Sequence, residues 1–154
     1  MVLIERIGAG RLDEAFAIVR EYYDAVGVSV REDADRFAKE YFRERSGLWL
    51  ASEGAQTLGC IALRPLPQFP QSGEVKRLYV LPQWRGRGVA ELLLTGLEAF
   101  AREIGYRALY LDTKDDLTAA IRFYRRHGYE PCERYNENPQ ATMFMRKDLP
   151  LDKK

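Results

Sequence analysis

The sequence predicts an α+β fold in which a mixed sheet carries helices on both faces. Segments with apolar residues every three or four positions, the spacing of amphipathic helices, alternate with short runs rich in β-branched and aromatic residues, which favour strands. Glycine and proline separate these segments. The predicted order is β, α, α, β, β, β, α, β, α, β, β, which amounts to seven strands and four helices.

The first part of the chain supplies three of the strands and two of the helices. Residues 1–7 are rich in Val, Ile and Leu and form the first predicted strand. Apolar residues at helical spacing predict a helix over residues 12–26, which a glycine then ends, and a second amphipathic helix over residues 32–42. Two strand-like runs follow at residues 48–52 and 58–63, and the glycine-containing stretch between them predicts a hairpin turn.

The rest of the chain begins with a proline-rich loop. Residues 65–73 carry three prolines, which cannot donate hydrogen bonds to a sheet. The remaining elements, in the order strand, helix, strand, helix, strand and strand, are residues 74–81, 89–104, 107–113, 118–127, 129–134 and 142–146. The helix over residues 89–104 has the clearest apolar face and is ended by a glycine.

Length and composition predict one domain spanning residues 1–154 and exclude several classes of protein. The 24 Lys and Arg side chains nearly balance the 23 Asp and Glu, and a net charge of +1 argues against a dedicated nucleic-acid binder. The longest uncharged stretch has ten residues, about half of what a membrane-spanning helix needs, and no secretory signal is recognised. We therefore expect a cytoplasmic protein without membrane contact. Cys60 and Cys132 match neither a disulfide framework nor a zinc motif, so buried thiols and no metal are expected.

The most informative stretch is a strand that runs through a glycine-bearing turn directly into the clearest helix. The first N–H groups of a helix lack intrahelical partners and point out of its N-terminus. This is the positive end of the helix dipole, so a phosphate is favoured there. Gly86 and Gly88 allow positive φ, while Arg85 and Arg87 add positive charge. An ordinary strand–helix turn is the alternative. Glu91 occupies the third-glycine position of a dinucleotide fingerprint, and no Gly-Lys-Ser/Thr occurs, so neither common nucleotide motif fits.

Two motifs in the second half of the chain match those of a known enzyme family. Residues 83–88, Gln-Trp-Arg-Gly-Arg-Gly, fit the pattern Gln/Arg-x-x-Gly-x-Gly/Ala, and residues 119–129 form a short tyrosine-bearing helix that ends in Gly-Tyr. Together they resemble the GCN5-related N-acetyltransferases (GNAT family). The resemblance implies a central mixed sheet of about seven strands flanked by four helices and splayed between the fourth and fifth strands. It also implies acetyl-CoA as cosubstrate.

The resemblance further implies which residues meet acetyl-CoA. Backbone N–H groups of the loop would bind the pyrophosphate, and the fourth strand would pair with the pantetheine arm. The corresponding cofactor-binding positions are Leu78, Tyr79, Val80, Gln83, Arg85, Gly86, Arg87, Gly88, Val89, Ala90 and Tyr124.

Two catalytic positions follow from the same resemblance. The N–H of Val80 corresponds to the oxyanion donor, and Tyr124 corresponds to the general acid that protonates the leaving thiolate. A phenol with a pKa near 10 is protonated at neutral pH and can donate to a thiolate whose pKa is near 8.5. The alternative for Tyr124 is an aromatic side chain that only packs on its helix face.

Glu74 is the predicted general base. Some family members carry a glutamate at this point of the fourth strand, and strand alternation predicts that Glu74, Lys76, Leu78 and Val80 share one face. The alternative is an ion pair of Glu74 with a neighbour such as Lys76 or Arg77.

Some positions depart from the family pattern or remain ambiguous. Leu117 stands where members often carry an asparagine that contacts the cofactor, and Asp116 or Thr118 is expected to cap the helix instead. Residues 135–139 either reach the acceptor site or form an ordinary hairpin turn. The segments that usually wall the acceptor pocket contain aromatic residues that are more often core than contact: Tyr22, Tyr23, Phe42 and Trp49.

The predicted function is transfer of an acetyl group from acetyl-CoA to a primary amine by direct attack. The alternative is a non-catalytic acyl-CoA-binding or regulatory module. A third hypothesis, a nucleic-acid or protein-interaction domain, depends only on Arg122, Arg125 and Arg126, which are more often a solvated face near the CoA phosphates. The sequence does not specify the acceptor amine, and it is compatible with a homodimer.

Overall fold

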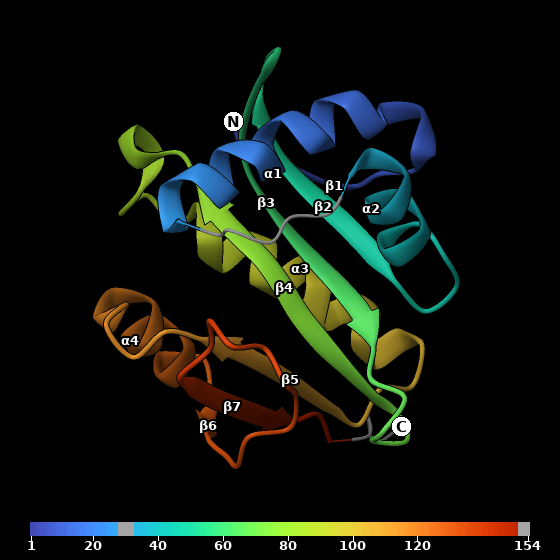
Figure 1. Ribbon diagram of the computed structural model, residues 1–154. Coiled ribbons are helices and arrows are strands. Elements are labelled where there is room, and N and C mark those ends of the chain that lie inside the picture. The colour runs from blue at the N-terminus through green and yellow to red at the C-terminus, as the bar shows by residue number, and fades with distance from the viewer. Residues whose placement is uncertain (28–32, 151–154) are drawn as a thin grey trace.

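The computed structural model describes residues 1–27 and 33–150, and these contain one seven-stranded sheet in the order β1-β2-β3-β4-β5-β7-β6 (Figure 1). The strands are β1 (Leu3–Arg6), β2 (Gly47–Glu53), β3 (Gln56–Pro65), β4 (Ser72–Val80), β5 (Ala108–Thr113), β6 (Glu130–Pro131) and β7 (Met143–Asp148). All neighbouring pairs are antiparallel except β4 and β5, which are parallel. The predicted mixed sheet is confirmed.

In the described part of the chain, four α-helices flank the sheet, as predicted. They are α1 (Leu12–Val26), α2 (Ala34–Tyr41), α3 (Val89–Glu103) and α4 (Thr118–Arg126), and two short 3₁₀ turns are η1 (Ala9–Arg11) and η2 (Pro82–Trp84). In Figure 1, α1 and α2 cover the near face of the sheet and α3 lies behind it. Asp33 caps α2 by accepting a hydrogen bond from the Arg36 N–H at 2.8 Å, and Glu32, the predicted start of this helix, lies outside the described residues. No helix among residues 1–27 and 33–150 is long and apolar enough to cross a membrane.

The two faces of the sheet carry separate hydrophobic cores. Leu93 and Leu97 of α3 and Tyr124 of α4 pack on one face. Tyr23 of α1 and Phe37 of α2 pack on the other. The loop that follows β6 lies on the near face with α1 and α2 (Figure 1).

The closing strands differ from their predicted bounds. A strand was expected over residues 129–134, but β6 comprises only Glu130–Pro131. The Cys132 N–H still donates to the Phe144 carbonyl at 2.8 Å. Beyond it, the Arg134 guanidinium donates to three carbonyls of the following residues, among them Ala141 at 3.0 Å. These bonds hold residues 134–141 as a loop instead of extending the hairpin.

A β-bulge in β4 reorients the strand. The register with β3 shifts between Cys60 and Ala62, and Arg77 has a positive φ of 59°. Val75 and Val80 consequently pack in the same core although they are an odd number of residues apart. The prediction that Glu74, Lys76, Leu78 and Val80 share one face is therefore wrong, because the extra residue of the bulge reverses the alternation.

The parallel pairing of β4 with β5 is short. It joins Ser72–Glu74 to Ala108–Tyr110 and then stops, whereas β4 continues to Val80 and β5 to Thr113. The strands therefore diverge beyond Glu74, as the predicted splay between the fourth and fifth strands required. The diverging halves leave one edge of β4 without a neighbouring strand.

Candidate active site

The glycine loop lies where β4 ends and α3 begins. Gly86 and Gly88 have φ of 77° and 80°, and a Cβ at either position would meet no atom within 4 Å. Glycine is required here by backbone conformation and not by lack of space. Gly88 is the N-cap of the 15-residue helix α3, and its carbonyl accepts from Leu92. The N–H groups of the first turn of α3 therefore have no intrahelical partner.

A hollow of about 300 Å³ opens beside this loop, and we call it the loop cavity. It is lined by Val80, Trp84, Arg85, Gly86, Gly88, Val89, Ala90, Glu91, Phe123 and Arg126. Arg126 comes from α4, so the loop and the arginine-bearing helix meet at one site. Of the three arginines noted in the sequence, only Arg126 lines this cavity, and Arg122 and Arg125 lie exposed on the same helix.

The two loop arginines are held by neighbouring groups. Arg85 Nε donates to the Val80 carbonyl at 2.9 Å, and its guanidinium lies 5.5 Å from the ring centre of Tyr79. Arg87 lies over the Trp84 ring at 4.8 Å. Arg85 thus fastens the loop to the end of β4. Gln83 is exposed on η2 and does not line the loop cavity.

Val80 presents its N–H to the open edge of β4. The next residue, Leu81, donates its N–H to the Leu58 carbonyl of β3 at 2.8 Å. N–H groups of successive strand residues point to opposite edges, so the Val80 N–H points away from β3. Tyr79 turns its side chain to the near face, where its hydroxyl lies 3.4 Å from Glu21. By the same alternation the Tyr79 N–H points towards β3, so neither this side chain nor this N–H faces the open edge.

A second cavity of about 110 Å³ lies between the diverging strands, and we call it the inner cavity. Its lining is Tyr22, Val75, Lys76, Arg77, Leu78, Asp112, Thr113, Leu117, Ala120 and Tyr124. Leu78 of β4 is part of this lining, and so is Tyr22, one of the four aromatic residues singled out in the sequence. Tyr23 and Trp49 are core residues, and Phe42 packs against the core.

Tyr124 reaches the inner cavity from α4. Only 8% of the residue is exposed, and its ring packs edge-on against Phe123 and Tyr129. Burial raises the pKa of Tyr124 above its ordinary value, and nearby Tyr22 and Asp112 raise it further. The phenol therefore stays protonated throughout the physiological pH range.

The N-terminus of α4 differs from expectation. Leu117 is the N-cap residue and no side chain caps the helix, so the expected cap by Asp116 or Thr118 is wrong. The turn before α4 is instead held by backbone and hydroxyl groups, because the Leu117 N–H donates to the Lys114 carbonyl and the Asp115 N–H donates to Thr142. Leu117 thereby faces the inner cavity as an apolar side chain.

Glu74 is buried at the closed end of the splay. Its Oε1 accepts from Arg64 at 2.8 Å, and its Oε2 accepts from the Tyr135 hydroxyl at 2.6 Å and from Asn136 at 3.4 Å. Burial raises the pKa of Tyr135, and the adjacent Glu74 carboxylate raises it further, so the phenol remains a donor. The main ion pair of Glu74 is with Arg64, while Lys76 lies at 4.0 Å. Glu74 does not line the inner cavity.

Asp112 is a residue that sequence reasoning missed. Its carboxylate accepts from Lys76 at 3.3 Å, from Asn136 at 2.7 Å and from Asn138 at 3.4 Å. Burial alone would raise the pKa of Asp112, but attraction to the Lys76 ammonium and the amide hydrogen bonds hold it below the ordinary value. A carboxylate at the end of an otherwise apolar and aromatic strand was the available signal. The same bonds tie residues 136–138 to the site.

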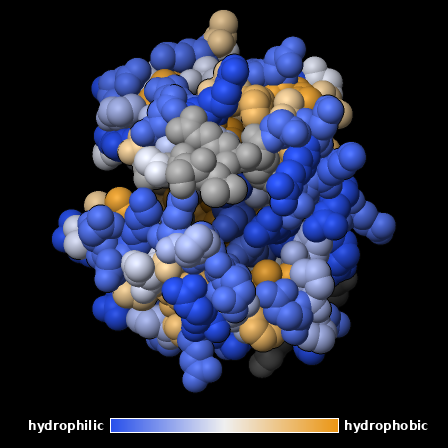
Figure 2. Space-filling model, viewed as in Figure 1, coloured by the Kyte–Doolittle hydropathy of each residue, from blue (hydrophilic) through white to orange (hydrophobic). Residues whose placement is uncertain are grey.

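A third cavity of about 470 Å³ adjoins the inner one on the near face, and we call it the outer cavity. Hydrophilic side chains surround this hollow in Figure 2. Its lining is Tyr22, Arg36, Arg64, Lys76, Arg77, Asp112, Thr113, Lys114, Leu117, Asn136, Asn138, Pro139, Gln140 and Ala141. The loop that contains residues 135–139 thus lines a site and is not only a hairpin turn.

Comparison with known proteins identifies the family. A model of the Acetyltransferase (GNAT) family matches residues 12–129. The chain belongs to the GNAT family. It is 31% identical, over 90% of its length and 88% of the relative's, to an uncharacterized N-acetyltransferase of Schizosaccharomyces pombe. It spans only about three fifths of rat N-acetyltransferase 8F1, to which it is 29% identical over 85% of this chain. As a GNAT member, the chain is an acyltransferase.

Solved GNAT structures share the fold. An acetyltransferase of this family from Staphylococcus aureus superposes with a TM-score of 0.85 at 18% identity, covering 97% of this chain and all of that one. The PaiA N-acetyltransferase of Thermoplasma acidophilum, solved in complex with coenzyme A, has a TM-score of 0.72 at 16% identity, covering 97% of this chain and 99% of that one. At these identities the likeness concerns the GNAT fold alone.

Proposed function

We propose that the protein moves an acetyl group from acetyl-CoA to a primary amine by direct attack. The observation that carries the proposal is a set of three features: the open edge of β4, the glycine loop at its end, and Tyr124, which lines the inner cavity together with Leu78 of β4. The Thermoplasma relative in complex with coenzyme A has the same fold, which supports acetyl-CoA as the donor.

The loop cavity suits the pyrophosphate of acetyl-CoA. Unpaired N–H groups at the start of α3 and the arginine from α4 supply donors and positive charge for an anion. The absence of any atom within 4 Å of a Cβ at Gly86 or Gly88 leaves the backbone open to close approach. The predicted contacts of Arg85 and Arg87 are then secondary, since both guanidinium groups already hold the loop in place.

The open edge of β4 suits the pantetheine arm and the thioester. Amide groups of the arm can pair with unpaired backbone of residues 78–80, as an added strand would. The Val80 N–H, turned to that edge, is then the donor for the oxyanion that develops when the amine attacks the thioester carbonyl. Tyr124 donates its phenolic proton to the departing thiolate of CoA.

The attacking amine must lose a proton, and we retain Glu74 as the predicted base, acting through water. Asn136 connects its carboxylate to the outer cavity, since the Asn136 amide donates both to Glu74 and to Asp112. Asp112 lines the inner cavity itself, so Asp112→Asn is the comparison for Glu74→Gln. Loss of the acidic limb of the kcat/KM pH profile in Glu74→Gln alone would support Glu74.

Direct attack requires no enzyme nucleophile. Burial raises the pKa of Cys60 to about 12, so this thiol is not ionised at neutral pH and cannot carry the acetyl group. Cys132 packs with Phe69 and Tyr135 in the small cluster that contains Ala108 and Tyr110 of β5, and it lines none of the three cavities.

The test is release of free CoA thiol from acetyl-CoA with a panel of amines. We expect amine-dependent release, and we expect Tyr124→Phe to lower kcat at least a hundredfold while acetyl-CoA still raises the melting temperature. Thermal stabilisation without product from any amine would instead support the alternative, a non-catalytic acyl-CoA-binding module. Turnover by Tyr124→Phe at the wild-type rate would remove Tyr124 from the mechanism.

The organisation as one domain over residues 1–154, the cytoplasmic location and the oligomeric state stay predictions. Limited proteolysis, cell fractionation and gel filtration test them respectively.

A further inference from the structure

The outer cavity has more positive than negative side chains. Among the described residues, its charged lining consists of Arg36, Arg64, Lys76, Arg77 and Lys114 against the carboxylate of Asp112. Part of this charge is balanced within the site. Lys76 pairs with Asp112 at 3.3 Å, and Arg64 pairs with Glu74 at 2.8 Å and Glu40 at 2.7 Å.

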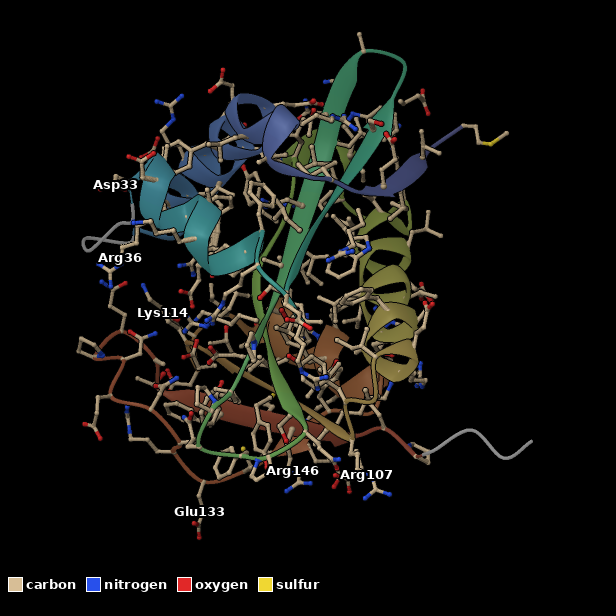
Figure 3. The ribbon with its side chains drawn as sticks, turned by 90° about the vertical axis from the view of Figure 1, so that its right-hand side faces the viewer. Asp33, Arg36, Arg107, Lys114, Glu133 and Arg146 are labelled. Atoms are coloured by element: carbon tan, nitrogen blue, oxygen red, sulfur yellow. The ribbon has the colours of Figure 1, made fainter. Side chains whose placement is uncertain are left out.

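Two further cations of this lining, Arg36 and Lys114, come from other elements. Arg36 comes from the first turn of α2 and Lys114 from the segment after β5, and Figure 3 shows them on the same side of the molecule, one above the other. Arg36 forms no ion pair with any residue among 1–27 and 33–150. Apart from Asp112, no carboxylate among those residues lines the cavity. The described part of the lining therefore presents a bound group with more cations than carboxylates.

The inner and outer cavities each contain residues that do not line the other. Tyr124 lines the inner cavity and not the outer, whereas Arg36 and Lys114 line the outer cavity and not the inner. Six residues line both cavities, which therefore adjoin: Tyr22, Lys76, Arg77, Asp112, Thr113 and Leu117. A ligand that spans them places one end beside Tyr124 and the Asp112 carboxylate and its other end between Arg36 and Lys114.

This polarity defines an acceptor class. We infer that the acceptor is a small molecule or peptide end that carries an anionic group besides its amine, with Arg36 and Lys114 binding that anionic group. The inference rests on the proposed acetyl transfer. Asp112 attracts the ammonium form of the amine towards the inner cavity before it loses its proton. The outer cavity of about 470 Å³ and the inner cavity of about 110 Å³ together fall in the range of about 300–1,000 Å³ for small-molecule sites.

The test compares matched acceptors that differ only in the anionic group. Alanine, methionine and phenylalanine are each paired with their primary amides, and 2-aminoethyl phosphate is paired with 2-aminoethanol. The ratio of kcat/KM for the anionic over the neutral member is measured in the wild type and in the variants Arg36→Gln and Lys114→Gln. Because ratios are compared between variants, the intrinsic reactivity of each amine cancels. The carboxylate and phosphate pairs distinguish the two kinds of anion.

Arg107→Gln is the matched control. Arg107 is an exposed arginine far from Arg36 and Lys114 (Figure 3). We expect at least one anionic member to be preferred in the wild type, and the preference to fall at least tenfold in Arg36→Gln and Lys114→Gln, mainly through KM. Arg107→Gln should keep the wild-type ratio and should acetylate the neutral amines at the wild-type rate.

Failure of this inference is distinguishable from failure of the proposed function. Turnover with equal ratios in the wild type and all variants overturns the inference and leaves acetyl transfer standing. If no acceptor releases thiol, calorimetric binding of the same pairs to the CoA-saturated protein decides. If the anionic members bind selectively and Arg36→Gln abolishes that selectivity, the anion site is supported although the proposed acetyl transfer is not. Unselective or absent binding overturns the anion site.

Discussion

Replacing Gly88 by alanine tests whether the glycine loop is required by its backbone conformation. Gly88 has a φ of 80°, and a Cβ there would meet no atom within 4 Å, so no clash with a neighbour contributes. The cost is then that of a left-handed conformation for an L-residue, about 1–2 kcal/mol. For a domain of this size, that corresponds to a fall in melting temperature of roughly 2–8 °C.

Gly105→Ala is the matched control for this variant. Gly105 follows the other end of α3, has a φ of 91° and also has no atom within 4 Å of its Cβ position. Both variants should lose a similar free energy of unfolding, measured by urea denaturation. Only Gly88→Ala should raise KM for acetyl-CoA, by about tenfold, because relaxation of the N-cap displaces the first N–H groups of α3.

Two outcomes would contradict this reasoning. Unchanged stability of both variants would show that the positive φ does not constrain these positions. Equal loss of stability with an unchanged KM for acetyl-CoA in Gly88→Ala would show that the loop does not bind the cosubstrate.

The remaining predictions concern two buried groups. The pKa of Asp112 in the folded protein is below its ordinary value, so its stabilising effect is present above about pH 4 and is lost as the pH falls through the folded pKa. Asp112→Asn should therefore lower the free energy of unfolding by about 1.5–3 kcal/mol at pH 7. Urea titrations should show that this difference from the wild type shrinks below about pH 4. A difference that is the same at pH 7 and below about pH 4 would contradict the prediction. Cys60 is completely buried with a pKa raised to about 12, so iodoacetamide at pH 8 should modify it only after denaturation, as mass spectrometry of the labelled peptides would show. Rapid labelling of Cys60 in the native protein would show that the core opens readily.

Much of the fold could be predicted because its signals are local. The apolar periodicity of residues 89–104 and the glycine after it predicted α3 within one residue of its observed end. The prolines of residues 65–73 predicted the connection between β3 and β4, although β3 extends through Pro65. The first closing strand was predicted too long because its end depends on Arg134, whose partners lie in the following loop.

The site was only partly predictable. Gly86, Gly88 and Tyr124 carry signals in their immediate neighbours, namely a strand before a helix and a short helix ending in Gly-Tyr. Asp112 carries only the signal of a carboxylate at the end of an apolar strand, because its partners Lys76 and Asn136 are 36 and 24 residues away along the chain. The assignment of Glu74 and Val80 to one face failed for a similar reason, since a bulge is set by the pairing of two strands.

The sequence by itself determined the order of elements, the glycine loop at the start of α3 and the family to which the chain belongs. These follow from interactions within a few residues, where backbone conformation and side-chain periodicity act directly. The tertiary structure decided where β4 leaves β5, which face each β4 side chain occupies, and which cations surround the outer cavity. Those features depend on hydrogen bonds and charge pairs between segments far apart in the chain, which form only when the sheet is assembled.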